Sequence, residues 1–219
     1  MQVPPQTPDK DRDTRSERKR RAILDAAARL FLQNGYLGTN MDQVAQQAEV
    51  SKQTVYKQFA SKEALFIAIV KSMTSDAGNR VHSERQSLDH VGDIGDYLRA
   101  YAERQLLVVL TPRLMQLRRL VIGEAGRFPE LGHALYEGGP GRAIGALAAE
   151  FEQFVERGLL VLDDAHSAAT HFNWLVMGEP VNKAMLLGDD AIPSPAALRQ
   201  HAADAVRVFL AAYAPRRPM

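Results

Sequence analysis

The stretch from Arg20 to Val70 decides the fold and reads RRAILDAAARLFLQNGYLGTNMDQVAQQAEVSKQTVYKQFASKEALFIAIV. Its apolar residues recur with helical spacing in segments that short polar breaks separate. The second and third segments are short and are joined by a tight turn, which is typical of the helix-turn-helix unit. The predicted helices run from about Arg15 to Asn34-Gly35, from Met41 to about Ala48, from Ser51 to Phe59, and from Ser61 to about Arg80.

Capping residues stand at the starts of these helices. Asn40 and Gln43 have the spacing of a capping box before the second helix. Ser51 and Ser61 can cap the third and fourth helices. The residues 48–50 form the turn between the second and third helices.

The exposed face of the third predicted helix carries hydrogen-bond donors and small contact groups. An α-helix fits the major groove of duplex DNA, where Gln pairs with adenine, Thr contacts the thymine methyl group and Lys reaches guanine or phosphate. The face therefore predicts a DNA-reading surface. It consists of Lys52, Gln53, Thr54, Tyr56 and Lys57.

Two lysines stand where a cation is unfavourable. Lys52 and Lys62 lie in the first turns of their predicted helices, where the helix dipole disfavours positive charge by about 0.3–1 kcal/mol. A DNA phosphate between the two helix starts would favour both lysines. The alternative is that both are only solvated.

These residues closely resemble the DNA-binding domain of the TetR/AcrR family of transcriptional repressors. The most diagnostic part is Val50-Ser51-x-x-Thr54-x-Tyr56-x-x-Phe59-x-x-Lys62-Glu63-x-Leu65. The resemblance implies packing roles for Val44, Ala45, Phe59 and Leu65. It also implies phosphate contacts from Thr39, Ser51, Thr54, Tyr56 and Lys62, and contacts to base edges or the DNA backbone from Lys52, Gln53 and Lys57.

One position departs from the pattern of this family. Glu49 occupies the turn position that is often glycine. A residue other than glycine with positive φ costs about 1 kcal/mol in strain. We expect the turn to persist, and the acidic side chain to weaken or bias DNA binding.

Charge is divided unevenly along the chain. The 27 Lys and Arg residues nearly balance the 26 Asp and Glu residues, which gives a net charge of +1. Residues 1–66 hold 11 basic and 8 acidic residues, a net charge of +3, whereas residues 67–219 hold 16 and 18, a net charge of −2. A basic run from Lys10 to Arg21 favours contact with phosphate. A solvated helix start is the alternative for this run.

Beyond Arg80 the sequence shows helix starts and stops, so an all-α fold with about nine helices is predicted. Together with the family resemblance, these signals divide the chain into a flexible basic arm (1–14), a helix-turn-helix DNA-binding domain (15–62), and an effector-binding and dimerisation domain (63–219). Four helices are expected in the last domain at Asp93–Leu110, Phe128–Tyr136, Arg142–Arg157 and Pro195–Tyr213, the third of them after a break at Gly138–Gly141. A fifth helix begins at the cap Thr111 and Pro112. A sixth is capped by Asp163 or Asp164, and Gly178 and Pro180 are expected to end or kink it.

The resemblance implies that the C-terminal domain binds a small effector inside and forms a homodimer through its last two long helices. The segments His166–Leu187 and Pro195–Tyr213 are rich in small and flexible apolar residues, so two copies could pack as a four-helix bundle. Packing on the core of the same subunit is the alternative. Apolar residues at helical spacing are candidates for the pocket wall, although each also fits an ordinary core position: Leu106, Leu117, Val121, Phe128, Leu131, Phe151, Phe154, Phe172, Trp174 and Met177.

Catalytic and cofactor chemistry has little support in the sequence. The chain has no cysteine, no HExxH motif, no G-x-S-x-G motif and no P-loop. Asp163, Asp164, His166 and His171 form a weak candidate metal site, for which a helix cap is the simpler explanation. We therefore expect no enzyme, catalytic residue, metal or cofactor. No apolar run approaches the roughly 18 residues of a membrane span, and no signal core is present, so a cytoplasmic protein is expected.

Three functions are compatible with these patterns. The first is a homodimeric bacterial transcriptional repressor that binds a palindromic double-stranded DNA operator and is released by a small hydrophobic or amphipathic effector. The second is a DNA-binding activator or architectural protein without a small effector. The third is a helical enzyme with a borrowed N-terminal domain. The diagnostic motif favours the first.

Overall fold

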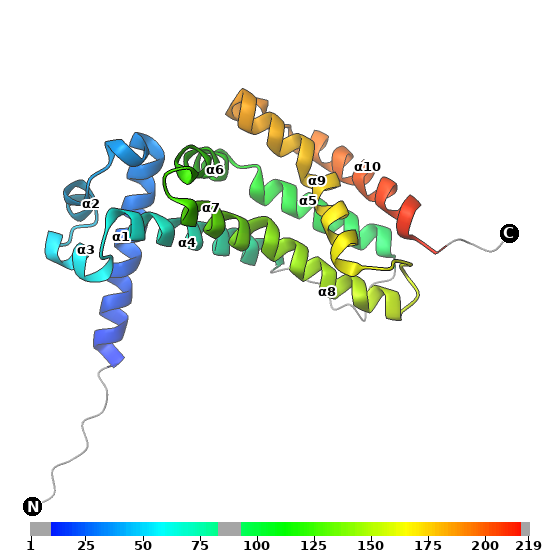
Figure 1. Ribbon diagram of the computed structural model, residues 1–219, viewed down its shortest axis with the longest axis horizontal. Helices are drawn as coiled ribbons and strands as arrows, with labels where there is room; N and C mark the ends of the chain where they lie inside the picture. The colour runs from blue at the N-terminus through cyan, green and yellow to red at the C-terminus, as the bar shows by residue number, and fades with distance from the viewer. Residues whose placement is uncertain (1–9, 83–92, 216–219) are drawn as a thin grey trace, which may run out of the picture. The chain divides into compact units, whose positions relative to one another are not determined.

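A computed structural model describes residues 10–82 and 93–215, which form helices and no strands within these ranges (Figure 1). The all-α prediction is therefore confirmed. Internal contacts divide the chain into two compact units, residues 1–69 and 70–219, which we call the head and the body. The division falls inside α4 (Lys62–His82), later than the border predicted after residue 62.

The head follows the predicted order of helices closely. Gly35 interrupts α1 at the predicted stop, with φ 74° and ψ 176°, a conformation that suits glycine because it has no Cβ. The start of α1 was predicted at Arg15 but lies at Lys10, so part of the predicted arm 1–14 is helical, and residues 1–9 lie outside the described residues. The helices of the head are α1 (Lys10–Gly38), α2 (Met41–Gln47), α3 (Lys52–Gln58) and the first turns of α4.

The head is held together by a small aromatic core and by local caps. The rings of Phe31 and Phe66 stack with centroids 4.9 Å apart, and Tyr36 lies against both. The predicted capping box is confirmed: Asn40 Oδ1 accepts from the Gln43 backbone N–H, and Gln43 Oε1 accepts from the Asn40 backbone N–H. The aromatic contacts join α1 to the first turns of α4, and the capping box fixes the start of α2.

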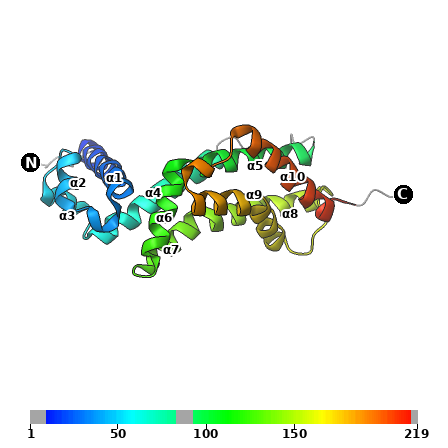
Figure 2. The same ribbon diagram turned by 90° about the horizontal axis from the view of Figure 1, so that it is seen from above.

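The body is a bundle in which α8 packs on α9, α9 on α10, and α10 on α5 (Figure 2). Its centre is a cluster of Phe151, Phe172 and Phe209, whose ring centroids lie 5.0–6.0 Å apart. The helices of the body are the rest of α4, α5 (Ile94–Val109), α6 (Pro112–Ala125), α7 (Pro129–Tyr136), α8 (Arg142–Glu156), α9 (Ala165–Leu187) and α10 (Pro195–Tyr213).

Three helices of the body begin at a side-chain cap, of which those at Asp164 and Ser194 were predicted. Asp93, Asp164 and Ser194 each accept a hydrogen bond from a backbone N–H in the first turn of α5, α9 and α10. Thr111 precedes Pro112 as predicted, but its side chain makes no capping hydrogen bond.

Gly178 and Pro180 were predicted to end or kink α9; they do not end it, because the helix continues through Pro180 to Leu187. A proline inside a helix cannot donate to the carbonyl four residues earlier, which here is that of Val176. His201 of α10 replaces the missing donor, since its Nε2 lies 2.8 Å from the Val176 oxygen. A partner from another helix therefore satisfies the carbonyl that the proline leaves free.

The predicted break at Gly138–Gly141 is a kink and not a loop. One π-helical turn, Glu137–Gly141, joins α7 to α8, and Gly139 has non-helical angles of φ −105° and ψ −105°. A Cβ on Gly138 would overlap the Thr74 hydroxyl of α4. Glycine is therefore required at this position for the close approach of the turn to α4.

Candidate functional site

The exposed face of α3 contains the side chains that were predicted to read DNA. Lys52, Gln53, Tyr56 and Lys57 are exposed, whereas Val55, on the opposite face, is fully buried. The N-cap Ser51 accepts from the Thr54 backbone N–H, and the two hydroxyl groups lie 2.8 Å apart. The short helix thus presents two hydroxyls, an amide, a phenol and two cations on one solvent-facing surface.

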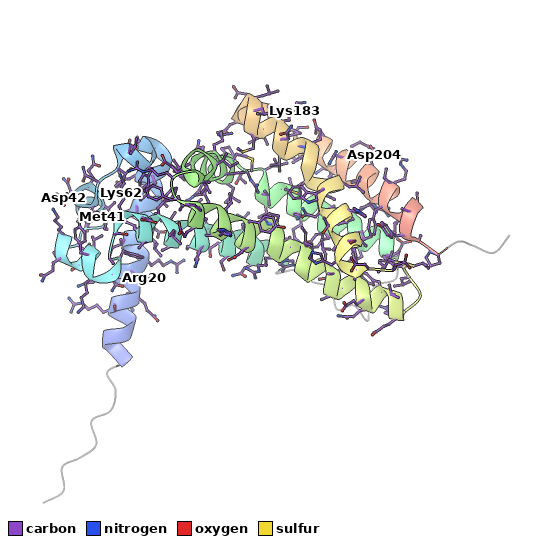
Figure 3. The ribbon with its side chains drawn as sticks, viewed as in Figure 1. Arg20, Met41, Asp42, Lys62, Lys183 and Asp204 are labelled. Carbon is purple, nitrogen blue, oxygen red and sulfur yellow. The ribbon has the colours of Figure 1, made fainter. Side chains whose placement is uncertain are left out.

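Lys52 has a partner within the head. Its Nζ lies 2.8 Å from one carboxylate oxygen of Asp42 and 3.1 Å from the other, and Asp42 lies on α2 (Figure 3). The hydrogen bond and charge of Asp42 raise the pKa of Lys52. This ion pair, formed between exposed groups, compensates for the unfavourable helix-start position without a phosphate.

Lys62 also has a partner inside the head. Its Nζ lies 4.4 Å from the centroid of the Tyr36 ring, close enough for a cation–π interaction. The positions of Lys52 and Lys62 are therefore explained by the folded head itself. A phosphate held between the two helix starts remains a prediction.

Thr39 differs from the other predicted DNA contacts because it is buried. Only 2% of the residue is exposed, and its hydroxyl donates to the Gly35 carbonyl at 2.9 Å. A contact from this hydroxyl to a DNA phosphate would require that bond to break. Thr39 therefore stabilises the turn between α1 and α2.

Arg20, from the basic run of α1, supports the far end of α3 (Figure 3). Its guanidinium lies 4.4 Å from the centroid of the Phe59 ring, and Nη1 donates to the Gln58 carbonyl at 3.5 Å. Arg15, Arg18 and Arg21 of the same run are exposed. One basic residue of the run thus has a structural role, and others are available to solvent.

Glu49 has the positive φ that the family resemblance implied for this turn position. Its φ is 54°, and it is the one non-glycine residue with positive φ in the described part of the chain. The backbone N–H groups of Glu49 and Val50 donate to the carbonyls of Gln46 and Ala45. The turn therefore persists without glycine, at the cost of a strained residue.

The body contains a cavity whose wall comes from α4, α5, α6, α7, α8, α9 and the π-helical turn between α7 and α8. The cavity volume is about 90 Å³, which is enough for several water molecules. The apolar part of the wall includes Met115, Leu117, Trp174, Met177 and Val181.

The predicted wall of the effector pocket agrees with this cavity at three positions, Leu117, Trp174 and Met177. The other seven residues do not line it. Leu106, Phe151, Phe154 and Phe172 are buried in the hydrophobic core, so helical spacing alone did not separate cavity walls from core. The remaining three are Val121 and Leu131, which are fully buried, and Phe128, which is half-buried.

The prediction missed polar residues of the cavity wall, among them Gln105, Arg118 and Asn173. A signal was present in the sequence. Gln105 follows Leu98 and Tyr101 on the apolar face of α5, and Asn173 follows Ala169 and precedes Val176 and Met177 on that of α9. A polar residue on an otherwise buried helix face needs a partner, which marks it for attention.

Large apolar side chains are exposed along α9 and α10. Trp174 is 47% exposed, and Leu175 and Val208 are also exposed. A shallow groove includes these three residues together with His171, Phe209, Ala212 and Tyr213. Exposed apolar patches of this kind mark surfaces for association.

Three further observations concern the candidate metal site and the predicted lack of a membrane span. Asp164 accepts from the backbone N–H groups of His166 and Ser167, as a helix cap does. A hydrogen bond with the Ser167 side chain, together with these backbone hydrogen bonds, lowers the pKa of Asp164. Within residues 10–82 and 93–215 no group of three His, Cys, Asp or Glu side chains could hold a metal ion. None of the described helices is both long and apolar enough to cross a membrane.

Known protein families match both units of the chain. The family described as bacterial regulatory proteins, tetR family, matches residues 23–69. The family described as the C-terminal domain of AefR-like transcriptional repressors matches residues 96–215, more than half of the chain. The protein belongs to the TetR family of transcriptional regulators. The helix-turn-helix, α2 and α3, lies within the residues that the tetR family matches.

Solved structures and curated relatives agree with this assignment. A TetR-family regulator from Mesorhizobium loti is 38% identical, with a TM-score of 0.86 over 92% of this chain and 99% of the other. The flavonoid-responsive regulator FrrA is 32% identical, with a TM-score of 0.78 over 92% and 100%. The transcriptional regulator RutR of Escherichia coli K12 is 35% identical over 85 residues, which are 39% of this chain and 40% of RutR. The match to RutR therefore spans less than half of each protein.

Proposed function

We propose that this TetR-family regulator is a homodimeric repressor that binds a palindromic DNA operator and is released by a small molecule bound in the body cavity. The observation that carries the proposal is the exposed face of α3, where Gln53, Tyr56 and Lys57 project from a fully formed helix-turn-helix. Each α3 would enter a major groove. The residues on phosphates would be Ser51, Thr54, Tyr56 and Lys62, and those on base edges or the DNA backbone would be Lys52, Gln53 and Lys57.

Two subunits would place two α3 helices on half-sites about 34 Å, or a multiple, apart. The exposed apolar side chains of α9 and α10 support a dimer through this face, since Trp174 and Val208 would leave water when two copies meet. Two helices from each subunit would then form a four-helix bundle.

The coupling between effector and DNA would run along α4. Phe66 of this helix lies in the aromatic core of the head, and Thr74, Gly78 and His82 of the same helix line the body cavity. A ligand that shifts α4 would therefore move the head to which its first turns belong. Linkage requires that ligand and DNA weaken each other by the same factor.

The test is a thermodynamic cycle on the full chain. Compounds that raise the melting temperature are titrated into the complex with a DNA fragment selected by the protein. We expect the operator affinity to fall and the affinity for the compound to fall by an equal factor when DNA is present. A compound that stabilises the protein and leaves the operator affinity unchanged contradicts release by an effector.

A second candidate, a transcriptional activator, has one specific observation in its favour. The activator FasR of Mycolicibacterium smegmatis is 37% identical over 87 residues, 40% of this chain and 38% of FasR. The match to the AefR-like repressor domain covers the body and favours repression. Transcription in vitro from the bound promoter separates the two: a repressor lowers transcript yield when it binds, and an activator raises it.

A further inference from the structure

Two buried amide side chains in the body leave one donor and one acceptor unpaired. Gln105 of α5 is 4% exposed and Asn173 of α9 is 1% exposed. Gln105 Nε2 donates to Asn173 Oδ1 at 3.0 Å, whereas Gln105 Oε1 and Asn173 Nδ2 have no hydrogen-bond partner. Exchanging oxygen and nitrogen in both amides reverses the bond between them but again leaves one donor and one acceptor free.

Both amides line the body cavity. A buried polar group without a partner destabilises the fold, and apolar side chains of the same shape would avoid this loss. The pair therefore presents a donor and an acceptor side by side in a chamber whose wall is otherwise mostly apolar. Such an arrangement is complementary to a molecule that carries its own acceptor and donor, such as an amide.

The charges of the cavity wall restrict the bound molecule further. The wall includes Arg118 of α6 and Arg142 of α8 but no Asp or Glu. Arg142 donates to Asn79 Oδ1 at 2.8 Å, whereas Arg118 makes no ion pair or hydrogen bond within the described residues. Burial of the Arg118 guanidinium lowers its pKa, because an unpaired cation is poorly solvated there. A carboxylate would supply the missing counter-charge.

We propose that the cavity binds a small organic acid with an apolar ring, whose carboxylate pairs with Arg118 and whose amide-like group hydrogen-bonds the Gln105–Asn173 pair. The ring lies among Leu117, Trp174 and Met177. This inference rests on the proposed function, in which the same cavity holds the effector, and it names the chemical class of that effector.

The test is calorimetry on the full chain without DNA, using three probes that differ by one group. The probe 4-acetamidobenzoate carries a ring, a carboxylate and an amide, whereas benzoate lacks the amide and acetanilide lacks the carboxylate. We expect 4-acetamidobenzoate to bind at least about 10-fold more tightly than either. Equal binding of the three probes, or no binding of 4-acetamidobenzoate, overturns the proposal.

Two variants test which residues cause the preference for 4-acetamidobenzoate over benzoate and over acetanilide. In the double variant Gln105→Met, Asn173→Leu the preference for 4-acetamidobenzoate over benzoate should fall to about 1, while the melting temperature stays equal or rises, because both free polar atoms are removed together. In Arg118→Met the preference over acetanilide should disappear. The matched controls are Gln153→Met and Arg113→Met, which change exposed residues of α8 and α6 and should keep both preferences.

The outcomes separate this inference from the proposed function. If the double variant keeps the preference over benzoate, the amide pair holds water and the inference is wrong. Operator binding of the ligand-free protein is measured on the same variants. Loss of probe preference with unchanged operator affinity supports the inference, whereas failure of the wild-type chain to bind any DNA refutes the proposed function and leaves the probe result standing.

Discussion

The head and the body hold their candidate functional groups in opposite ways. In the head, these groups lie on the outside, within the short stretch from Ser51 to Lys62, and adjacent residues of α3 supply most of them. In the body they lie inside, where Thr74, Gln105, Arg118 and Asn173 come together from α4, α5, α6 and α9. A surface formed by one short helix follows from local sequence, whereas a cavity depends on how distant helices pack.

The comparison predicts that damage to the core of the head leaves the body intact. Phe31→Ala removes a buried ring of the head core, which should destabilise the head by about 3–5 kcal/mol and abolish DNA binding. The body should still bind its ligand. Leu37→Ala is the control, because Leu37 is 74% exposed, and should change stability by less than about 0.5 kcal/mol. Urea unfolding with calorimetry checks both, and loss of ligand binding in Phe31→Ala would show that the fold of the body depends on the core of the head.

A second prediction concerns the body, where a side chain from one helix replaces a hydrogen bond that is missing in another. His201→Ala leaves the Val176 carbonyl without its partner and should cost about 1–3 kcal/mol of stability. In a Pro180→Ala background, residue 180 regains a backbone N–H that can donate to the same carbonyl, so His201→Ala should cost less. Urea unfolding of the two single variants and the double variant gives the coupling. Purely additive effects would show that His201 does not compensate for Pro180.

A smaller effect on stability is expected at the turn between α2 and α3 of the head. Glu49→Gly relieves the positive φ and should stabilise the head by up to about 1 kcal/mol, and removal of the negative charge should raise the affinity for DNA. Glu49→Gln is the matched control, since it removes the charge and keeps the strain. It should raise DNA affinity without a gain in melting temperature. Equal melting temperatures for the glycine and glutamine variants would indicate that the turn is not strained.

The smallest expected effect concerns a single phosphate contact. Lys57→Ala should weaken binding to all DNA sequences and reduce the slope of log affinity against log salt by about 1 per head. Lys183→Ala is the control, because Lys183 is an exposed lysine of α9 in the body (Figure 3). Fluorescence anisotropy at several salt concentrations measures both slopes. Equal slopes for Lys57→Ala and the wild type would remove Lys57 from the interface.

The helices and most caps were predictable because their signals lie within a few residues. The capping box of Asn40 and Gln43 is an example, whereas the positive φ of Glu49 was implied by the family resemblance. The continuation of α9 through Pro180 was not predictable, because its compensating partner, His201, lies on another helix. Periodicity locates a buried residue, and only packing decides whether that residue touches core or cavity.

For the candidate DNA surface, the exposure of side chains was predictable, but their contacts with other elements were not. The exposure of Gln53, Tyr56 and Lys57 followed from the pattern of α3. The ion pair of Lys52 with Asp42 and the position of Lys62 over Tyr36 did not, because each joins two elements whose relative placement helical periodicity does not contain. The same holds for the burial of Thr39.

Selection of bound DNA from a random-sequence pool tests the central claim, that two copies of α3 read DNA. For the full wild-type chain we predict enrichment of an inverted repeat with half-site centres about 34 Å, or a multiple, apart. For Gln53→Ala we predict the same spacing with relaxed preference at one base pair of each half-site, equivalent to about 1–3 kcal/mol of discrimination. A pool without an enriched sequence, or an unchanged base preference in Gln53→Ala, would contradict the claim.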